Sequence, residues 1–409
     1  MKGKLLYIHQ YFKTPQEGGA IRSYYLAKGL VKKGFEVEMI TSHNQSVYTT
    51  KMIDGIKVHY LPVPYRNEMG FLQRIRSFIL FVQKAKKLAF SIEGVEKAYI
   101  TSTPLTVGSI GLYLKKKKHI PFIFEVRDLW PKAPIEMGVF RNPLIKKWLY
   151  DYEKKIYKAA DKIVALSPDM RDWVKEVVPN KDVFMVPNMA DCEFFQPELK
   201  DPKLIEFYHA NEPFVITYLG SIGQTNHLEF LLDIAELSKA KDLHINIKIV
   251  GQGSRLNQIK LAAYEKRLSN IEFISHQNKE GVKRILNVTD ATYVSFKDVS
   301  VLGSNSPNKL FDSLASGKLT IVNTTGWTKT LVEKYKCGFY ANPHNPEHFI
   351  DLIQPFLTKK DLLEKYKKNA RSIAEKLYSK RLQVEKIAGI LDNEHSIKVS
   401  EDEVYILTA

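Results

Sequence analysis

Lys309 and Asp312 stand one helical turn apart in a stretch whose residue types could bind an anionic ligand. The apolar run 291–296 predicts a buried strand, and residues 310–314 have the spacing of a helix that faces a core. A small-residue loop joins the two. The pattern therefore predicts a corner at which a strand ends and a helix begins, with a lysine in the first helical turn.

The start of this helix favours phosphate chemistry. Ser306 is the expected N-cap, Pro307 suits the first turn, and Gly317 marks the end. The free N–H groups of a helix N-terminus bind anions. A lysine there interacts unfavourably with the helix dipole, so local helix stability does not explain why this position holds Lys309. An ordinary strand–helix crossover with a polar cap is the alternative.

A second candidate pair, Arg127 and Asp128, directly follows the strand-like run 121–126. Charged residues at the carboxyl end of a parallel strand are where open α/β sheets place their sites. The alternative is a local Arg–Asp ion pair.

Gly18 and Gly19 form a third candidate, between a predicted strand at 4–11 and a predicted helix at 20–33. Paired glycines let a ligand approach the backbone, and the helix N-terminus favours an anion. We assign Arg22 to the same acceptor or phosphate side. Plain turn chemistry is the alternative.

Strand and helix patterns alternate through both halves of the chain, which predicts an α/β protein with two Rossmann-like domains. Glycines follow the first two strands of the second half, at Gly220, Gly223, Gly251 and Gly253. The stretch 187–197 reads as a linker. We therefore predict domains at 1–194 and 195–380, and a crossing helix and tail at 381–409.

The 409 residues carry a net charge of +16, and nearly all of it lies in the first half. Residues 1–190 hold 32 basic and 17 acidic side chains, or +15, which leaves 29 and 28, or +1, for the rest. This asymmetry indicates an anionic partner for the first half. The two cysteines, Cys192 and Cys337, have no metal-like spacing, and no apolar run is long enough to span a bilayer. A reducing cytosol is the simple reading.

Residues 71–90 form the most amphipathic segment of the chain, with Leu72, Ile75 and Phe78 on its apolar stripe and basic residues largely off it. This pattern is typical of a helix that lies on an anionic membrane surface. A helix packed on the sheet with a solvated basic face explains the pattern equally well. Lys115–Lys118 adds a further basic cluster, which we expect in a solvated loop.

The stretch 303–318 resembles the donor-binding signature of retaining GT-B glycosyltransferases of family 4, in which seven residues separate two glutamates. Asp312 falls on the second glutamate, residues 315–318 follow in register, and Ser304 replaces the first. Arg127-Asp-Leu-Trp-Pro131 matches a subgroup acting in O-antigen and capsule synthesis that includes N-acetylfucosaminyl transferase-like members.

The resemblance implies a GT-B fold with an inter-domain cleft and a last helix that crosses back to the first domain. It implies retaining, metal-independent transfer of a sugar, of hexosyl or N-acetylhexosaminyl type, from a nucleotide diphosphate sugar. No cofactor is expected beyond that co-substrate, which we expect to be UDP-linked. The predicted donor-binding residues are Gly220, Ser221, Gly223, Gly251, Gly253, Ser306, Pro307, Asn308, Lys309, Leu310 and Asp312.

In this interpretation Lys309 stabilises the diphosphate leaving group and Asp312 holds the ribose hydroxyls. Arg127 and Asp128 face the acceptor or the transferred sugar, and with Lys309 they are the predicted catalytic residues. The expected partners are a lipid-linked or saccharide acceptor and the anionic inner face of the membrane, where the protein would be peripheral and cytoplasmic. Nucleic acid is not expected, because no known binding signature accompanies the basic half.

The sequence departs from the family pattern at two phosphate-binding cations. Their positions hold Ser221 and either Asn226 or His227, which leaves Lys309 as the substitute. Two alternatives stay open: a nucleotide-sugar epimerase of the same fold, and a non-catalytic partner of another transferase.

Overall fold

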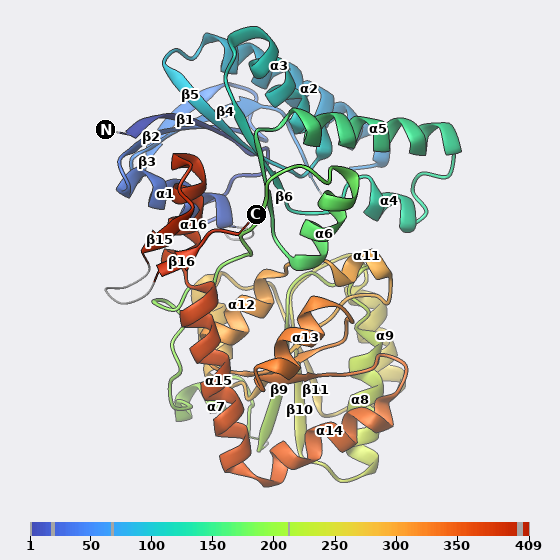
Figure 1. Cartoon of the computed structure of the whole chain (residues 1–409). Helices are drawn as coiled ribbons and strands as arrows, with labels where there is room; N and C mark the ends of the chain where they lie inside the picture. Colours follow the sequence, from blue (N-terminus) through green and yellow to red (C-terminus); the bar gives the residue numbers. More distant parts are fainter. Residues whose placement is uncertain (1, 18–20, 67–68, 212, 399–403, 409) are drawn as a thin grey trace. The chain divides into compact units, whose positions relative to one another are not determined.

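The structure is a computed structural model that describes all residues except 1, 18–20, 67–68, 212, 399–403 and 409 (Figure 1). The chain divides into two compact units. Unit 1 comprises Met1–Pro187, Ser304–Ser306 and Arg381–Ala409, and unit 2 comprises Asn188–Gly303 and Pro307–Lys380. The chain thus leaves unit 1 after the eighth strand and returns to it with its last helix.

Unit 1 is built on a sheet with strand order β3-β4-β2-β1-β5-β6-β7-β8. All neighbouring pairs are parallel except the edge pair β3–β4. The strands are β1 (Lys2–Ile8), β2 (Phe35–His43), β3 (Thr49–Ile53), β4 (Ile56–Pro62), β5 (Val95–Thr101), β6 (Phe122–Val126), β7 (Lys162–Ala165) and β8 (Val183–Met185).

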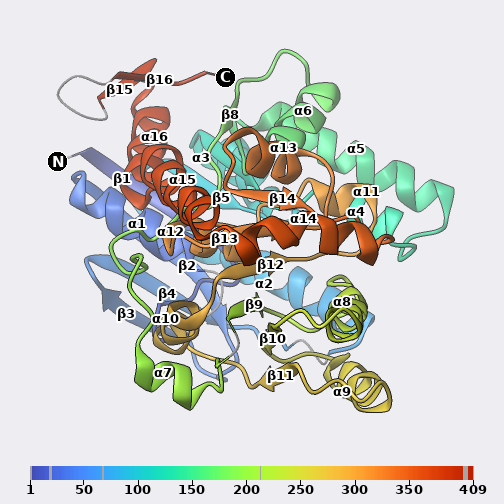
Figure 2. The same cartoon turned by 90° about the horizontal axis from the view of Figure 1, so that it is seen from below.

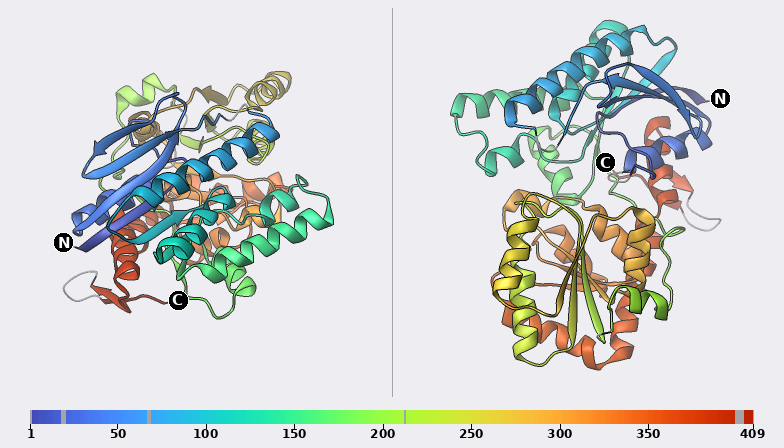
Figure 3. Two further views of the ribbon diagram at one scale, coloured as in Figure 1. Left: turned by 90° about the horizontal axis from the view of Figure 1, so that it is seen from above. Right: turned by 180° about the vertical axis from the view of Figure 1, so that it is seen from behind.

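Helices cover both faces of this sheet. The helices are α1 (Arg22–Lys32), α2 (Phe71–Ser91), α3 (Gly108–Lys118), α4 (Lys132–Glu136), α5 (Pro143–Ala159), α6 (Pro168–Val177) and α16 (Lys380–Asp392). Helices α2, α3 and α5 lie along one face, as Figure 3 shows from above. On the other face α1 meets α16 so closely that a Cβ atom at Gly29 would stand 2.5 Å from Val384 Cγ2. A small antiparallel pair, β15 (Ser396–Lys398) and β16 (Val404–Ile406), follows.

The predicted strand–helix–strand start of the chain is confirmed by β1, α1 and β2. The basic cluster Lys115–Lys118, expected in a loop, instead forms the last turn of α3. Cations are favourable there because they complement the carboxyl end of the helix dipole. Lys115 also pairs with Asp161 at 2.7 Å. Part of the positive charge of the first half is therefore structural.

Helix α2 spans the predicted segment, and its predicted apolar stripe is buried only in part. Val82 and Ala89 of the stripe are buried together with Phe81, whereas Leu72 is 79% exposed and Ile79 is 50% exposed. The buried stripe lies where α2 packs on α3 and the sheet. The amino-terminal half of α2 consequently presents large apolar side chains to solvent.

Unit 2 contains a parallel sheet with strand order β11-β10-β9-β12-β13-β14. Its strands are β9 (Phe214–Leu219), β10 (Ile245–Val250), β11 (Ile271–Ile274), β12 (Ala291–Val294), β13 (Leu319–Val322) and β14 (Gly338–Tyr340). Its helices are α7 (Pro202–Phe207), α8 (Glu229–Ala240), α9 (Leu256–Glu265), α10 (Lys279–Val288), α11 (Ser300–Gly303), α12 (Asn308–Ala315), α13 (Trp327–Lys334), α14 (Pro346–Thr358) and α15 (Lys360–Tyr378).

Helices lie on both faces of the sheet of unit 2 (Figure 2), and an apolar layer holds them on each face. Ile216 and Tyr218 of β9 face a layer shared with α8, α9 and α14, and Val215 and Leu219 face a layer shared with α10, α12 and α15. The alternation follows from the pleat, which directs successive side chains to opposite faces. Both faces are buried, as expected for a parallel sheet.

The predicted corner before α12 is present, with one correction. The helix begins at Asn308, and its N-cap is Pro307 in an extended conformation, with φ −76° and ψ 133°. Ser306 is therefore not the N-cap, because the fixed φ of Pro307 is used one residue before the helix. Lys309 lies in the first turn as predicted, and Gly317 ends the helix in the left-handed conformation with φ +60°.

Candidate active site

The donor-side residues of unit 2 gather at one edge of its sheet. Because β9, β10 and β12 are parallel, the loops that follow them emerge at the same edge. The loop after β9 begins at Gly220, the loop after β10 at Gly251, and the loop after β12 leads into α11 and α12. Figure 2 shows these strands side by side, with α12 on one face. This edge brings together the predicted glycines and Lys309.

The two glycine loops pack on each other through their backbones. Ile222 N–H donates to Gln252 O at 2.9 Å, and a Cβ atom at Gly251 would stand 1.8 Å from Gly220 O. Gly251 also has φ +152°, which side chains disfavour. Gly253 likewise faces Ile222 O, at 2.2 Å from a built Cβ. These glycines shape the loops, and their contact with a donor stays a prediction.

Lys309 carries a buried ammonium group that lacks an ionic partner. Its Nζ atom makes no hydrogen bond with the described residues. The atom lies 4.0 Å from the ring centroid of Tyr218 and 5.5 Å from that of Phe296. A Cβ atom at Gly220 would come within 3.1 Å of it. Burial lowers the pKa of Lys309 to about 7.

The aromatic floor under Lys309 is itself held in place. Tyr218 Oη donates to Ser221 O at 2.6 Å, so the loop after β9 fixes the ring. Ser221 thus contributes its carbonyl, while its side chain is exposed. Asn226 Oδ1 accepts from Gly223 N–H at 3.3 Å. A cation–π contact stabilises an ammonium only in part, so this arrangement is suited to an incoming anion.

The other predicted residues in and before α12 differ in how far their side chains are exposed to solvent. Asn308 is exposed, whereas the Leu310 side chain is wholly buried in the core and its N–H donates to Pro307 O at 3.1 Å. Ser306 and Pro307 precede the helix. Asn308 is thus the exposed residue of this set, Pro307 is half-buried, and Ser306 is buried.

Asp312 carries a carboxyl group whose ionisation is suppressed. Burial raises its pKa to about 7, neighbouring Lys279 lowers the pKa and Asp191 raises it further. The folded protein without ligand therefore holds a proton here near neutrality. Hydroxyl donors at this position would favour the carboxylate.

We expect Asp312→Asn to weaken binding of UDP and of UDP-glucose by the same factor, because a ribose contact is shared by both. A hydrogen bond to a charged group contributes about 1.5–3 kcal/mol, or roughly 10- to 150-fold. Calorimetric titration measures both affinities. Unchanged affinity for UDP would contradict this placement.

The same substitution should raise stability at pH 8. The folded pKa of Asp312 lies above its ordinary value, so the parent loses stability as pH rises from about 4 to about 7. Thermal unfolding should therefore show a larger gain in stability of the variant over the parent at pH 8 than at pH 5.

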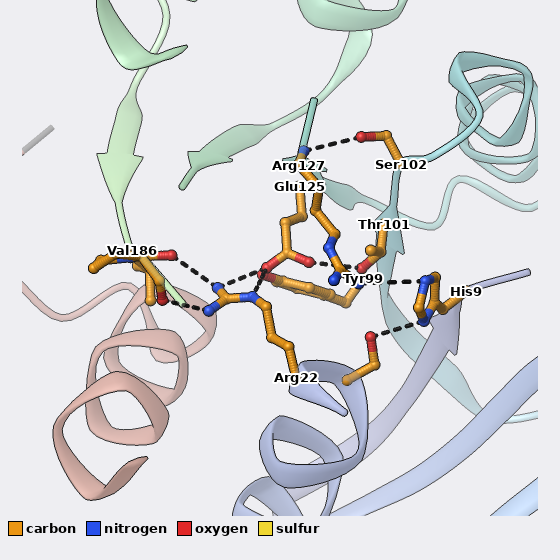
Figure 4. Close-up of polar contacts among 10 residues, drawn as sticks. His9, Arg22, Tyr99, Thr101, Ser102, Glu125, Arg127 and Val186 are labelled. Atoms are coloured by element: carbon orange, nitrogen blue, oxygen red, sulfur yellow. Dashed lines mark hydrogen bonds and ion pairs between the residues drawn. The ribbon is translucent and has the colours of Figure 1, made fainter. Parts of the chain in front are cut away.

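Unit 1 contains a separate polar cluster at the carboxyl ends of β1, β5 and β6 (Figure 4). We call His9, Ser23, Thr103, Arg127 and Asp128 the polar cluster. Arg127 Nη1 lies 3.3 Å from His9 Nε2, and His9 Nδ1 lies 2.9 Å from Ser23 Oγ. Burial and the Arg127 charge hold the pKa of His9 well below its usual value. The imidazole is therefore neutral, with Nε2 accepting from Arg127 and Nδ1–H donating to Ser23.

The alternative of a local ion pair does not describe Arg127 and Asp128. The Arg127 guanidinium points toward His9, as Figure 4 shows. Thr103 Oγ1 donates to Asp128 Oδ2 at 3.0 Å. Both side chains are half-buried at the sheet edge. Each side chain contacts a different neighbour, so each retains capacity for a polar ligand. Their contact with an acceptor stays a prediction.

Arg22 is buried and fully engaged inside unit 1. Its Nη2 and Nε atoms each lie 2.8 Å from Glu125 Oε1, and the guanidinium also donates to the carbonyls of Val186 and Pro187. This geometry assigns Arg22 to positioning the sheet rather than to holding a phosphate. Gly18 and Gly19 lie outside the described residues.

Sequence reasoning missed His9 and Glu125. Burial opposes the ionisation of Glu125, but the Arg22 and Arg127 charges and the bonds from Arg22 and Tyr99 lower its pKa overall. A glutamate inside the apolar run 121–126 was a signal for a buried partner, and a histidine directly after the first strand was a signal for the sheet edge. Among the described residues, no group of His, Cys, Asp and Glu side chains is placed to hold a metal ion.

Each of the two units is an α/β unit with a largely parallel sheet and with polar residues at the carboxyl ends of the strands. This architecture is that of the GT-B class of glycosyltransferases, as similar solved structures show. The solved structure of sucrose-phosphate synthase from Thermosynechococcus elongatus is similar with a TM-score of 0.78, at 15% identity over 96% of this chain and 99% of that one. Anabaena Alr3699/HepE in complex with UDP and glucose has a TM-score of 0.69, at 14% identity over 95% and 99%.

The chain belongs to the family 4 glycosyltransferases. Residues 17–194 match the model described as Glycosyltransferase Family 4, and residues 202–373 match Glycosyl transferases group 1. An uncharacterized glycosyltransferase, MJ1178 of Methanocaldococcus jannaschii, is 19% identical over 349 residues, which cover 82% of this chain and 90% of that protein. The predicted fold is thereby confirmed.

Proposed function

We propose that this glycosyltransferase moves a hexosyl or N-acetylhexosaminyl residue from a UDP-sugar to a saccharide acceptor linked through diphosphate to a lipid, in bacterial surface polysaccharide synthesis. The reaction retains the anomeric configuration and needs no metal ion. The Arg127–Pro131 match to the O-antigen and capsule subgroup supports the acceptor class. The Anabaena structure, bound to UDP and glucose, supports the donor class.

The observation that carries the proposal is the buried ammonium of Lys309. Negative charge develops on the diphosphate as the bond to the sugar breaks, and a fixed cation stabilises that charge. Lys309 stands in the first turn of α12 beside the rings of Tyr218 and Phe296, and its Nζ atom makes no hydrogen bond with the described residues. A diphosphate would supply the missing ionic partner and restore the lysine's charge.

This role predicts a specific pH dependence. With a pKa of about 7 in the free protein, Lys309 is mostly charged at pH 6 and mostly neutral at pH 8. An anionic donor binds the charged form, so the affinity that Lys309 contributes should fall about tenfold over this interval. We expect the ratio of UDP-glucose affinity, parent to Lys309→Met, to fall by that factor. Taking the ratio cancels the opposite titration of Asp312.

Membrane association follows from the charge of the first half. The described part of the chain contains no helix long and apolar enough to cross a bilayer. The protein would bind the cytoplasmic face of the inner membrane peripherally. Lys84 donates to Pro62 O at 3.0 Å and Lys86 lies over the Tyr113 ring, so these two lysines are partly committed. Exposed Arg76 is the better test, and Arg76→Gln should lower recovery on anionic vesicles.

The direct test is incubation with a panel of UDP-sugars and a lipid-diphosphate-linked saccharide, with the product identified by mass spectrometry. Nuclear magnetic resonance then gives the anomeric configuration, and EDTA should leave the rate unchanged. Release of UDP without an acceptor, together with an altered sugar, would instead indicate an epimerase. No binding of any nucleotide sugar would indicate a non-catalytic partner.

A further inference from the structure

Unit 1 contains an apolar cavity of about 580 Å³ that the donor chemistry does not use. It lies between the amino-terminal half of α2, the loop 103–106 and the segment that joins α4 to α5. Its volume falls within the roughly 300–1,000 Å³ typical of small-molecule sites. Figure 3 shows α2 and α5 on the same face of the sheet.

Aromatic rings form much of the cavity wall. Three ring pairs contribute: Tyr65 with Phe78, Phe71 with Phe140, and Trp148 with Tyr152. Polar atoms are few. Thr106 Oγ1 is buried at the cavity with no hydrogen-bond partner among the described residues, and Arg74 adds a cation to the wall. The lining therefore suits a long apolar group with a small anionic part.

The mouth of the cavity is also apolar. Five residues both line the cavity and are exposed: Phe71 by 48%, Ile79 by 50%, Val139 by 49%, Ile145 by 45% and Trp148 by 63%. A soluble surface seldom gathers such side chains without a ligand or partner. The cavity therefore opens to solvent through an apolar rim.

The inner end of the cavity adjoins the polar cluster. Thr103 lines the cavity and donates to Asp128 at 3.0 Å, and Tyr11, also in the lining, follows His9 by two positions on the chain. One ligand could thus place an apolar chain in the cavity and a polar end toward Arg127 and Asp128. A flat contact surface for another protein would need neither the cavity nor this connection.

We propose that this cavity holds the hydrocarbon chain of the acceptor lipid next to its phosphate or diphosphate, with Arg74 beside that anionic group. The inference rests on the proposed function, since it names the part of the acceptor that the enzyme recognises. The cavity then selects acceptors by their lipid, independently of the sugar.

Calorimetric titration with farnesyl diphosphate as the probe tests the site without turnover. The parent should bind it about tenfold or more tightly than inorganic diphosphate, because each buried methylene group strengthens binding about fourfold. Burial of the chain should also give a negative heat-capacity change. Equal affinity for the two probes would overturn the proposal.

A matched pair of variants on one helix locates the site. Ile75 lines the cavity, whereas Leu72 is 79% exposed and outside the lining. Ile75→Asp should weaken farnesyl diphosphate binding about tenfold or more, and Leu72→Asp should leave it unchanged. Ile145→Trp is a second test in case Ile75→Asp folds poorly, because it fills the mouth of the cavity without burying a charge. It should also weaken farnesyl diphosphate binding about tenfold or more. Equal effects of Ile75→Asp and Leu72→Asp, or none from Ile145→Trp, would overturn the assignment.

Two further outcomes are separable. If the parent glycosylates neither a long-chain nor a short-chain acceptor while farnesyl diphosphate still binds, the proposed function fails and the cavity assignment stands. If both acceptors are used equally and Ile75→Asp changes neither rate, the cavity assignment fails alone. A concentration-dependent dimer that farnesyl diphosphate does not dissociate would show that a second copy covers the cavity.

Discussion

Replacing Lys309 with methionine should lower kcat by roughly 10²–10³ while leaving the protein folded and slightly more stable. The loss follows because one preorganised charge donor at a developing anion contributes about that factor. The gain in stability follows because the folded protein buries an ammonium that has no ionic partner in the described part of the chain. The pKa of Lys309 is lowered to about 7 from an ordinary value near 10.5, so this destabilisation is fully present below pH 7 and fades as pH rises toward 10.5. Steady-state kinetics at saturating donor and thermal unfolding at pH 6 and pH 10 measure the two effects.

Lys318 provides the matched control for this variant. It is a buried lysine in the turn between α12 and β13, and burial lowers its pKa to about 7 as well. Lys318→Met should share the change in stability and keep kcat within about twofold, because Lys318 lies outside the predicted site. Equal losses of kcat in the two variants would show that Lys309 acts through the packing of α12 and not on the leaving group.

Replacing Arg22 with methionine should lower the free energy of unfolding of unit 1 by about 3–5 kcal/mol, because it leaves the Glu125 carboxylate buried and unpaired. A loss of this size is a large share of the roughly 5–15 kcal/mol of a typical domain. Hydrogen exchange of peptides from β1 and β6 across a urea series measures the free energy of unfolding of unit 1 separately from that of unit 2.

The pH dependence of stability and a double variant test whether the loss of the Arg22–Glu125 ion pair causes the destabilisation. Glu125 has a lowered pKa in the parent, so its contribution to stability is present above about pH 4.3 and is lost as pH falls further. Without Arg22, burial raises the pKa, so the difference between parent and variant should be larger at pH 7 than at pH 4. Arg22→Met combined with Glu125→Gln should recover part of the loss. A double variant no more stable than Arg22→Met would contradict the ion-pair explanation.

The fold could be predicted from the sequence because its signals are local. Apolar runs of four to eight residues alternate with amphipathic segments, and the parallel sheets follow from that alternation. Two predictions, the N-cap of α12 and the loop at Lys115–Lys118, were wrong because two local signals compete at each place. Pro307 can start a helix or precede one, and a lysine run fits both a loop and the last turn of a helix. In the structure Pro307 precedes the helix, and the lysine run forms the last turn of α3.

Lys309 could be singled out from the sequence as a candidate site residue, because local stability does not explain a lysine in the first turn of a helix. His9 and the roles of Arg22 and Glu125 could not be read in the same way, because they depend on strands far apart in the sequence that become neighbours only in the sheet. The apolar cavity was hidden for a similar reason. A helical stripe shows which residues are apolar, but not which of them remain exposed after α2 packs on α3.

The return of α16 to unit 1 has a consequence for how the chain is made. Val384 packs against Gly29, and the Lys162 side chain donates to Ile390 O at 2.7 Å, so unit 1 is finished only by residues beyond 380. Unit 2 is therefore an insertion, and on the ribosome it has all of its residues before unit 1 does. About 350 residues separate α1 from α16, so the face of α1 around Gly29 stays uncovered until α16 has been made, and such a separation raises contact order and slows folding. A chain stopped before Arg381 should therefore be prone to aggregate through α1, while its unit 2 folds normally.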